Sequence, residues 1–158
     1  MDLENAPVIS MADPVQELQR LNAFIGTWHG QGISRDPKTQ KMIAMKSVET
    51  FKWVPGGHFI EHRWDWSMGS DKFRGLEVIG YNADQSNFFA NLYDDQGHFV
   101  TYKVIEHGGI WTYTGEKQRA LLEVSSDGRT IRDRWESTEN QIDWIPLCDV
   151  IWTRIINS

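Results

Sequence analysis

Residues 43–68 have the sequence IAMKSVETFKWVPGGHFIEHRWDWSM, in which two alternating segments flank a turn. The tetrapeptide Val54-Pro55-Gly56-Gly57 places Pro and Gly at the central positions of a type II turn, which predicts a β-hairpin. Successive side chains of a strand point to opposite faces. We expect the more apolar face of 57–68 to be the interior. That face carries His58, Ile60, His62, Trp64, Trp66 and Met68.

The same turn predicts how the two strands pair. We expect Val54 to pair with Gly57, which fixes the register of the whole hairpin. The resulting pairs are Trp53–His58, Phe51–Ile60, Glu49–His62, Ser47–Trp64 and Met45–Trp66. Paired residues share a face, so these residues of the first strand also point inward, and Lys46 and Lys52 point outward. A slip of one residue would invert every side chain of the neighbouring strand.

Beyond this hairpin, turn signals such as Asp95-Gln96-Gly97 and Gly108-Gly109 divide the chain into further strands. About ten strands are expected, near 27–35, 43–54, 57–68, 72–82, 86–94, 98–106, 109–115, 118–126, 129–138 and 142–156. Asp13, followed by Pro14 and then Gln16, is typical of a capped helix start. The pattern predicts an all-β fold, a closed antiparallel up-and-down β-barrel with a short N-terminal helix closing one end. A β-sandwich is the open alternative.

A second hairpin is predicted at Asp127-Gly128. Its register pairs Val124 with Ile131, Leu122 with Asp133 and Ala120 with Trp135. Tyr102 is expected to point inward because its neighbour Lys103 must point outward, and Trp111 is also assigned to the interior. The inward face of the strands between residues 70 and 115 is otherwise left open, including the choice between Phe88 and Phe89.

The composition excludes several classes of function. The chain has 158 residues, which favours one barrel domain over 13–158 after a flexible tail over 1–12. Its net charge of −6 argues against nucleic-acid binding, and it has no apolar run long enough to cross a membrane. A single cysteine, Cys148, and no signal-peptide pattern indicate a reducing, cytoplasmic location.

Eight Trp residues are a large number for this chain length, and many of them have inward parity. The predicted ligand-contacting residues are Glu49, Phe51, Trp53, His58, His62, Trp64, Trp66, Tyr102, Trp111 and Trp135. Glu49, His62 and Asp133 are polar residues in this apolar interior, so each needs a partner. Glu49 and His62 either form a satisfied cross-strand pair, are wetted through an opening, or meet the polar end of a ligand. No metal site is expected, because His58 and His62 lie about 13 Å apart along a strand.

The segment LNAFIGTWHGQG, residues 21–32, resembles the opening of lipocalin-like (calycin) proteins, in which a G-x-W signature follows a short helix. The sequence is similar to a bacterial domain-of-unknown-function family, numbered 1579, also through Gly56-Gly57-His58-Phe59, Gly80-Tyr81-Asn82 and Ile151-Trp152-Thr153-Arg154. The resemblance implies that Trp28 packs under Arg154 at one barrel end. It also implies structural roles for Gly26, Gly30 and Gly32.

The same segment more distantly resembles nitrobindin, a haem-binding barrel whose ligating histidine lies late in the chain. No histidine follows His107 here, so haem binding is the least favoured function and no cofactor is expected. The leading hypothesis is binding or carriage of a small, largely apolar molecule in the barrel. The alternative is a cofactor-free isomerase or cyclase with Glu49, His62 or Asp133 as acid–base groups. A homodimer is a further possibility.

Overall fold

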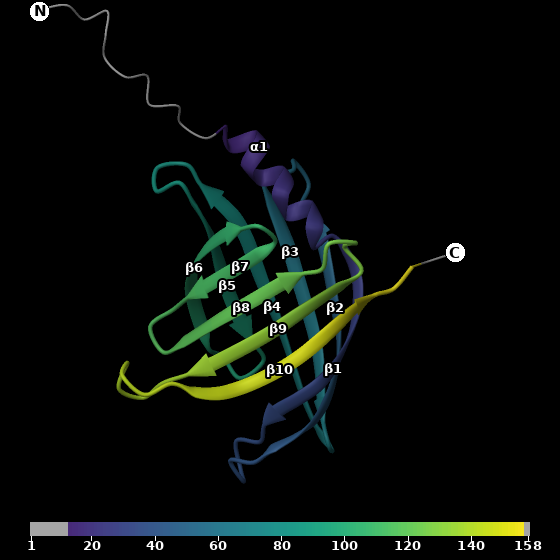
Figure 1. Ribbon diagram of the computed structural model, residues 1–158, viewed down its shortest axis with the longest axis vertical. Helices are drawn as coiled ribbons and strands as arrows, with labels where there is room; N and C mark the ends of the chain where they lie inside the picture. The colour runs from purple at the N-terminus through teal and green to yellow at the C-terminus, as the bar shows by residue number, and fades with distance from the viewer. Residues whose placement is uncertain (1–12, 157–158) are drawn as a thin grey trace, which may run out of the picture.

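The computed structural model describes residues 13–156, and these form a closed antiparallel barrel of ten strands (Figure 1). The strands are β1 (Gly26–Arg35), β2 (Met42–Trp53), β3 (Phe59–Met68), β4 (Asp71–Asn82), β5 (Asn87–Asp94), β6 (Phe99–His107), β7 (Ile110–Thr114), β8 (Gln118–Val124), β9 (Thr130–Ser137) and β10 (Ile145–Arg154). Each strand pairs with its neighbour in sequence, and β1 closes the ring against β10. The predicted up-and-down barrel is therefore confirmed, and the β-sandwich is excluded. The tail expected over 1–12 lies outside the described residues.

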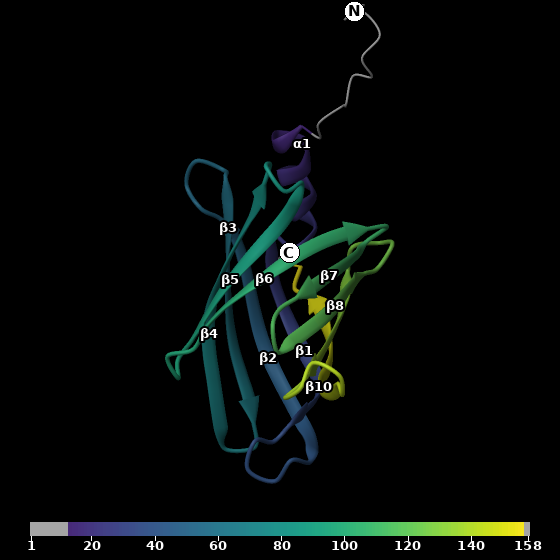
Figure 2. The same cartoon turned by 90° about the vertical axis from the view of Figure 1, so that its left-hand side faces the viewer.

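A short helical segment covers one end of the barrel, as predicted (Figures 1 and 2). It consists of α1 (Pro14–Gln19) and the 3-10 helix η2 (Arg20–Ala23). The Asp13 side chain caps the helix by accepting a hydrogen bond of 3.0 Å from the backbone N–H of Val15. Leu21 and Phe24 are fully buried, so this segment contributes an apolar plug to the barrel interior.

Arg154 and Trp28 join the helical segment to the barrel wall. The Arg154 guanidinium lies 4.1 Å from the centre of the Trp28 ring, which is the cation–π contact implied by the family resemblance. The guanidinium also donates hydrogen bonds to the backbone carbonyls of Ala23, Ile25 and Gly128. The Trp28 indole N–H donates to the carbonyl of Phe24 at 2.8 Å. One end of the barrel is thus held by contacts among α1–η2, β1 and β10.

The first hairpin has the predicted faces but a different register. Glu49 pairs with Trp64 and Phe51 pairs with His62, each shifted by two residues from the prediction. The type II turn is present, with Gly57 N–H bonded to Val54 C=O and Gly56 at φ 103°. However, Val54 N–H donates to the carbonyl of Phe59, so Gly57 and His58 belong to the connection. A shift of two residues preserves which side chains point inward.

The second hairpin has the predicted register, with Leu122 opposite Asp133 and Ala120 opposite Trp135. In the region left open by the sequence, Phe88 points into the core and is 2% exposed, whereas Phe89 packs against Phe59 on the outside. On β1, Gly32 lies so close to β10 that a Cβ there would be 2.1 Å from the carbonyl oxygen of Asp149. This close approach requires glycine.

Candidate functional site

A cavity of about 560 Å³ lies inside the barrel. Its residues at the end opposite α1 include the exposed side chains of Pro37, Arg74, Gln96 and His98, so the cavity opens to solvent there. Figure 2 shows that the β1–β2 connection lies at this end. Deeper apolar and aromatic lining residues are Phe51, Trp64, Trp66, Met68, Phe73, Leu92, Tyr102, Tyr113, Leu122, Trp135, Cys148 and Trp152. This size and lining are typical of a small-molecule site.

Packed aromatic rings close the cavity at the α1 end. Phe24 lies 5.3 Å from Phe51 and 4.9 Å from Trp111, measured between ring centres. Phe88 packs against the opposite edge of Trp111 at 5.0 Å. These rings fill the barrel under the helix, so the cavity is open at one end and closed at the other.

A histidine held between two carboxylates forms the polar centre of the cavity. The imidazole of His62 on β3 lies 2.9 Å from Glu49 Oε2 through Nε2 and 3.2 Å from Glu77 Oε1 through Nδ1. The second oxygen of Glu49 accepts a hydrogen bond of 2.8 Å from the Trp66 indole N–H. The imidazole stacks on the Phe51 ring at 3.9 Å with an interplanar angle of 6°. Adjacent strands β2, β3 and β4 supply all of these groups.

The charge of His62 follows from this geometry. Burial alone lowers the pKa of His62, but hydrogen bonds to Glu49 and Glu77 and their negative charges outweigh it and raise the pKa to about 9. At neutral pH the imidazole is therefore protonated, and each ring N–H donates to one carboxylate. Both donors of His62 are thus occupied within the protein.

Asp133 on β9 is a different kind of acid. It is 1% exposed, and its Oδ1 has no hydrogen-bond partner among the described residues. Burial raises the pKa of this carboxyl well above its usual range, and the negative charge of Glu49 raises it further. The opposing influences of Trp135 and His62 are smaller. Asp133 faces the cavity, and its carboxyl holds its proton to a higher pH than an exposed aspartate does.

The structure brings most of the sequence-predicted site residues together around the cavity. Lining residues among them are Glu49, Phe51, His62, Trp64, Trp66, Tyr102, Asp133 and Trp135. Three other predicted contacts do not line this cavity. His58 is exposed in the turn, because the register shift removes it from β3, and Trp111 is buried in the plug. Trp53 is half-buried at the helical end, where its indole donates to the Asn22 side chain at 2.9 Å.

Glu77, Tyr113 and Trp152 line the cavity but were not among the predicted contacts. Glu77 and Tyr113 lie in strands whose inward face the sequence left open. Trp152 belongs to the motif Ile151-Trp152-Thr153-Arg154 of the family resemblance; it lines the cavity, and its ring lies 5.8 Å from those of Phe51 and His62. Trp152 lies on the same face of β10 as Val150 and Cys148, which are both buried, and this alternation identifies Trp152 as inward-pointing.

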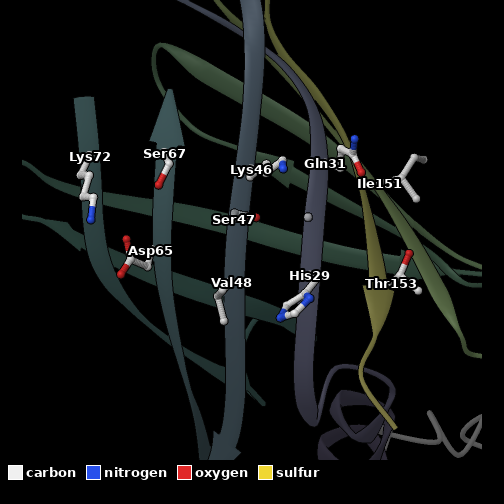
Figure 3. Close-up of a pocket in the computed structure, with 11 residues that line it drawn as sticks. His29, Gln31, Lys46, Ser47, Val48, Asp65, Ser67, Lys72, Ile151 and Thr153 are labelled. Carbon is white, nitrogen blue, oxygen red and sulfur yellow. The ribbon is translucent and has the colours of Figure 1, made fainter. Parts of the chain in front are cut away.

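A second hollow lies on the outer surface of the barrel, over β1, β2, β3, β4 and β10 (Figure 3). His29, Lys46 and Lys72 line it and are exposed. These side chains have the opposite strand parity from the cavity residues, so the hollow is separate from the interior.

Within residues 13–156, no group of three or more His, Cys, Asp or Glu side chains has a geometry that could hold a metal ion. Over the same range, no helix combines the length and apolar composition required to cross a bilayer.

The closed barrel, the capping helix and the central cavity define a lipocalin-like (calycin) protein. Within that class, the chain belongs to the family described as "Protein of unknown function (DUF1579)", whose model matches residues 13–141. The family membership implied by the motifs around Trp28 is therefore confirmed. No sequence among the curated proteins matches this chain.

Solved structures with the same architecture have very different sequences. Rv2717c from M. tuberculosis matches with a TM-score of 0.66 and 12% identity, covering 91% of this chain and 99% of that one. The S-type phycobiliprotein lyase CPES from Guillardia theta matches with a TM-score of 0.56 and 9% identity, covering 93% of this chain and 96% of that one. The zebrafish ileal bile acid-binding protein, complexed with cholic acid, matches with a TM-score of 0.45 and 12% identity, covering 84% of this chain and 99% of that one. At these identities the first two structures support the fold alone.

Proposed function

We propose that this protein binds or carries a small, largely apolar molecule inside the barrel. The observation that carries the proposal is the cavity of about 560 Å³, which is open at one end and lined mostly by aromatic and aliphatic side chains. Burial of apolar ligand surface contributes about 25 cal/mol per Å². The ring faces of Trp64, Trp66 and Trp135 supply rigid contact area at little entropic cost.

Native mass spectrometry of the freshly purified full chain tests this proposal. We expect a copurifying small molecule, at one per chain, that organic extraction releases. Titration of the extracted protein with a panel of apolar compounds should then quench its tryptophan fluorescence. A protein without any bound molecule, whose fluorescence no compound in the panel alters, would contradict the proposal.

Asp133 favours a second candidate function, a cofactor-free isomerase or cyclase. A carboxylic acid facing the cavity can donate its proton to one atom of a bound substrate and regain a proton that the substrate releases from another atom, so that isomerisation leaves the carboxyl unchanged. Chromatography would detect conversion of a bound compound, since isomerisation leaves its mass unchanged. If Asp133→Asn abolishes turnover but still binds the compound, catalysis by Asp133 would be established. Binding without turnover would leave carriage as the function.

A further inference from the structure

Most polar groups in the cavity already have partners within the protein. Both ring N–H groups of His62 are engaged by Glu49 and Glu77, and Glu49 also accepts from Trp66. The Tyr102 hydroxyl donates to the Gln118 side chain at 2.8 Å. A ligand that hydrogen-bonded to these groups would have to break an existing interaction.

Two buried polar atoms in the cavity lining have no partner among the described residues. They are Asp133 Oδ1 and the indole nitrogen, Nε1, of Trp152, and both residues are at least 98% buried. Buried polar groups in native proteins nearly always have a hydrogen-bond partner, so an unpaired group in a cavity indicates a missing ligand atom. The unpartnered hydroxyl of Ser47 does not line the cavity.

The two unpaired groups are neighbours on the inner face of the barrel. Asp133 on β9 pairs with Val150 on β10, and Trp152 lies two residues further along β10. Such diagonal neighbours on one face of an antiparallel pair lie about 7–8 Å apart at their Cα atoms, within reach of aromatic side chains. One small polar group can therefore meet both.

The chemistry of the pair selects the ligand group. The Trp152 indole is a donor only, so it requires an acceptor such as a carbonyl oxygen. A protonated Asp133 both donates and accepts. A ligand carboxylate would lie near the charges of Glu49 and Glu77, and the positive charge of His62 is already bonded to both of these carboxylates. A ligand ammonium group has only donors, so it cannot accept a hydrogen bond from the Trp152 indole N–H.

From this arrangement we infer that Trp152 and Asp133 recognise an uncharged carbonyl-containing group, such as a carboxamide, at the buried end of the apolar ligand. The inference rests on the proposed function and adds the chemical class of the ligand. The carbonyl oxygen accepts from the Trp152 N–H, and the amide N–H donates to Asp133. The apolar remainder of the ligand lies along Trp64, Trp66 and Trp135 toward the open end.

Three ligands with one tail and different head groups test the inference. Dodecanamide, dodecanoate and dodecylamine are each made to compete with the neutral fluorescent probe N-phenyl-1-naphthylamine bound to the full chain. We expect dodecanamide to compete at least about tenfold more tightly than the other two. Trp152→Phe, which keeps a ring but removes the N–H, should weaken dodecanamide about tenfold more than it weakens the probe.

Asp133 provides an independent arm of the same experiment. Asp133→Leu should remove the preference for the amide, whereas Asp133→Asn, which keeps a neutral donor and acceptor, should retain it. Dodecanoate binding as tightly as dodecanamide, or an amide preference that Trp152→Phe leaves unchanged, would overturn the inference. If the probe itself does not bind, the proposed function fails and the inference with it. If the probe binds without head-group selectivity, the inference alone fails.

Discussion

At the scale of single residues, His62 links the chemistry of the cavity to the stability of the fold. Its pKa is raised from 6.5 to about 9 in the folded protein, so folding favours the protonated ring. This contribution to the free energy of unfolding is complete below pH 6.5 and is lost as the pH rises through about 9.

We therefore expect urea unfolding to show a stability loss of a few kcal/mol between pH 6.5 and pH 9. The Asp133 carboxyl contributes in the same direction, because its pKa is also raised on folding. For this reason the measurement is made in an Asp133→Asn background, where the remaining pH dependence belongs to the histidine site. His62→Gln in that background should flatten the profile. A flat profile with His62 present would contradict the account.

Asp133 itself should lower stability at neutral pH. The pKa of this carboxyl is raised on folding, so the unfolded state gains stability relative to the folded state as the pH rises above about 4. Asp133→Asn should therefore raise the free energy of unfolding more at pH 7 than at pH 4. Asp149→Asn, at an exposed ion pair with Arg132, is the control and should not stabilise. Lower stability of Asp133→Asn at pH 7 would show that the carboxyl is ionised in the fold.

At the scale of secondary-structure elements, Arg154 holds the helical segment onto β10. Lysine can replace its charge but not its set of hydrogen bonds to the carbonyls of Ala23, Ile25 and Gly128. Arg154→Lys should lower the free energy of unfolding by about 1–2 kcal/mol. Arg132→Lys, at an exposed ion pair on the preceding strand, should change it by less than about 0.5 kcal/mol. If Arg154→Lys and Arg132→Lys lowered stability equally in thermal unfolding, the role given to Arg154 would be contradicted.

Gly75 on β4 sets the position of a cavity wall. A Cβ at Gly75 would lie 1.8 Å from the Trp64 ring, so the indole lies directly against this glycine. Gly75→Ala should displace the ring, cost about 1–3 kcal/mol and shift the tryptophan emission. Gly69→Ala is the control: nothing lies within 4 Å of its Cβ, and only its φ of 58° opposes the change. Unaltered emission from Gly75→Ala would contradict this packing.

The sequence predicted the elements well because alternation and turn residues are local signals. Asp127-Gly128 gave the correct register, while Val54-Pro55-Gly56-Gly57 gave the correct faces with a shift of two residues. That shift depends on the Val54–Phe59 hydrogen bond, which the turn type alone does not determine. Glu77 escaped prediction because β4 alternates weakly, with Leu76 and Val78 on the face opposite to Glu77. Its pairing with His62 depends on the register of β3 against β4, in which the two residues lie directly opposite each other.

At the scale of the whole molecule, the barrel separates a sealed end from an open end. Phe24, Phe88 and Trp111 fill the interior under α1, and the charged and polar residues at the other end surround the opening. Under the proposed function, the ligand enters between the β1–β2 and β5–β6 connections and meets the His62 cluster and Asp133 at depth.

Binding of N-phenyl-1-naphthylamine to a matched pair of variants tests the central claim most directly. Leu92 lines the cavity, whereas Leu121 is exposed on the outside of the barrel. The account predicts that Leu92→Phe, which fills part of the cavity, weakens probe binding by about tenfold or more. It also predicts that Leu121→Phe binds like the parent chain. Equal probe affinity of both variants and the parent, or no binding by the parent, would contradict a ligand site inside the barrel.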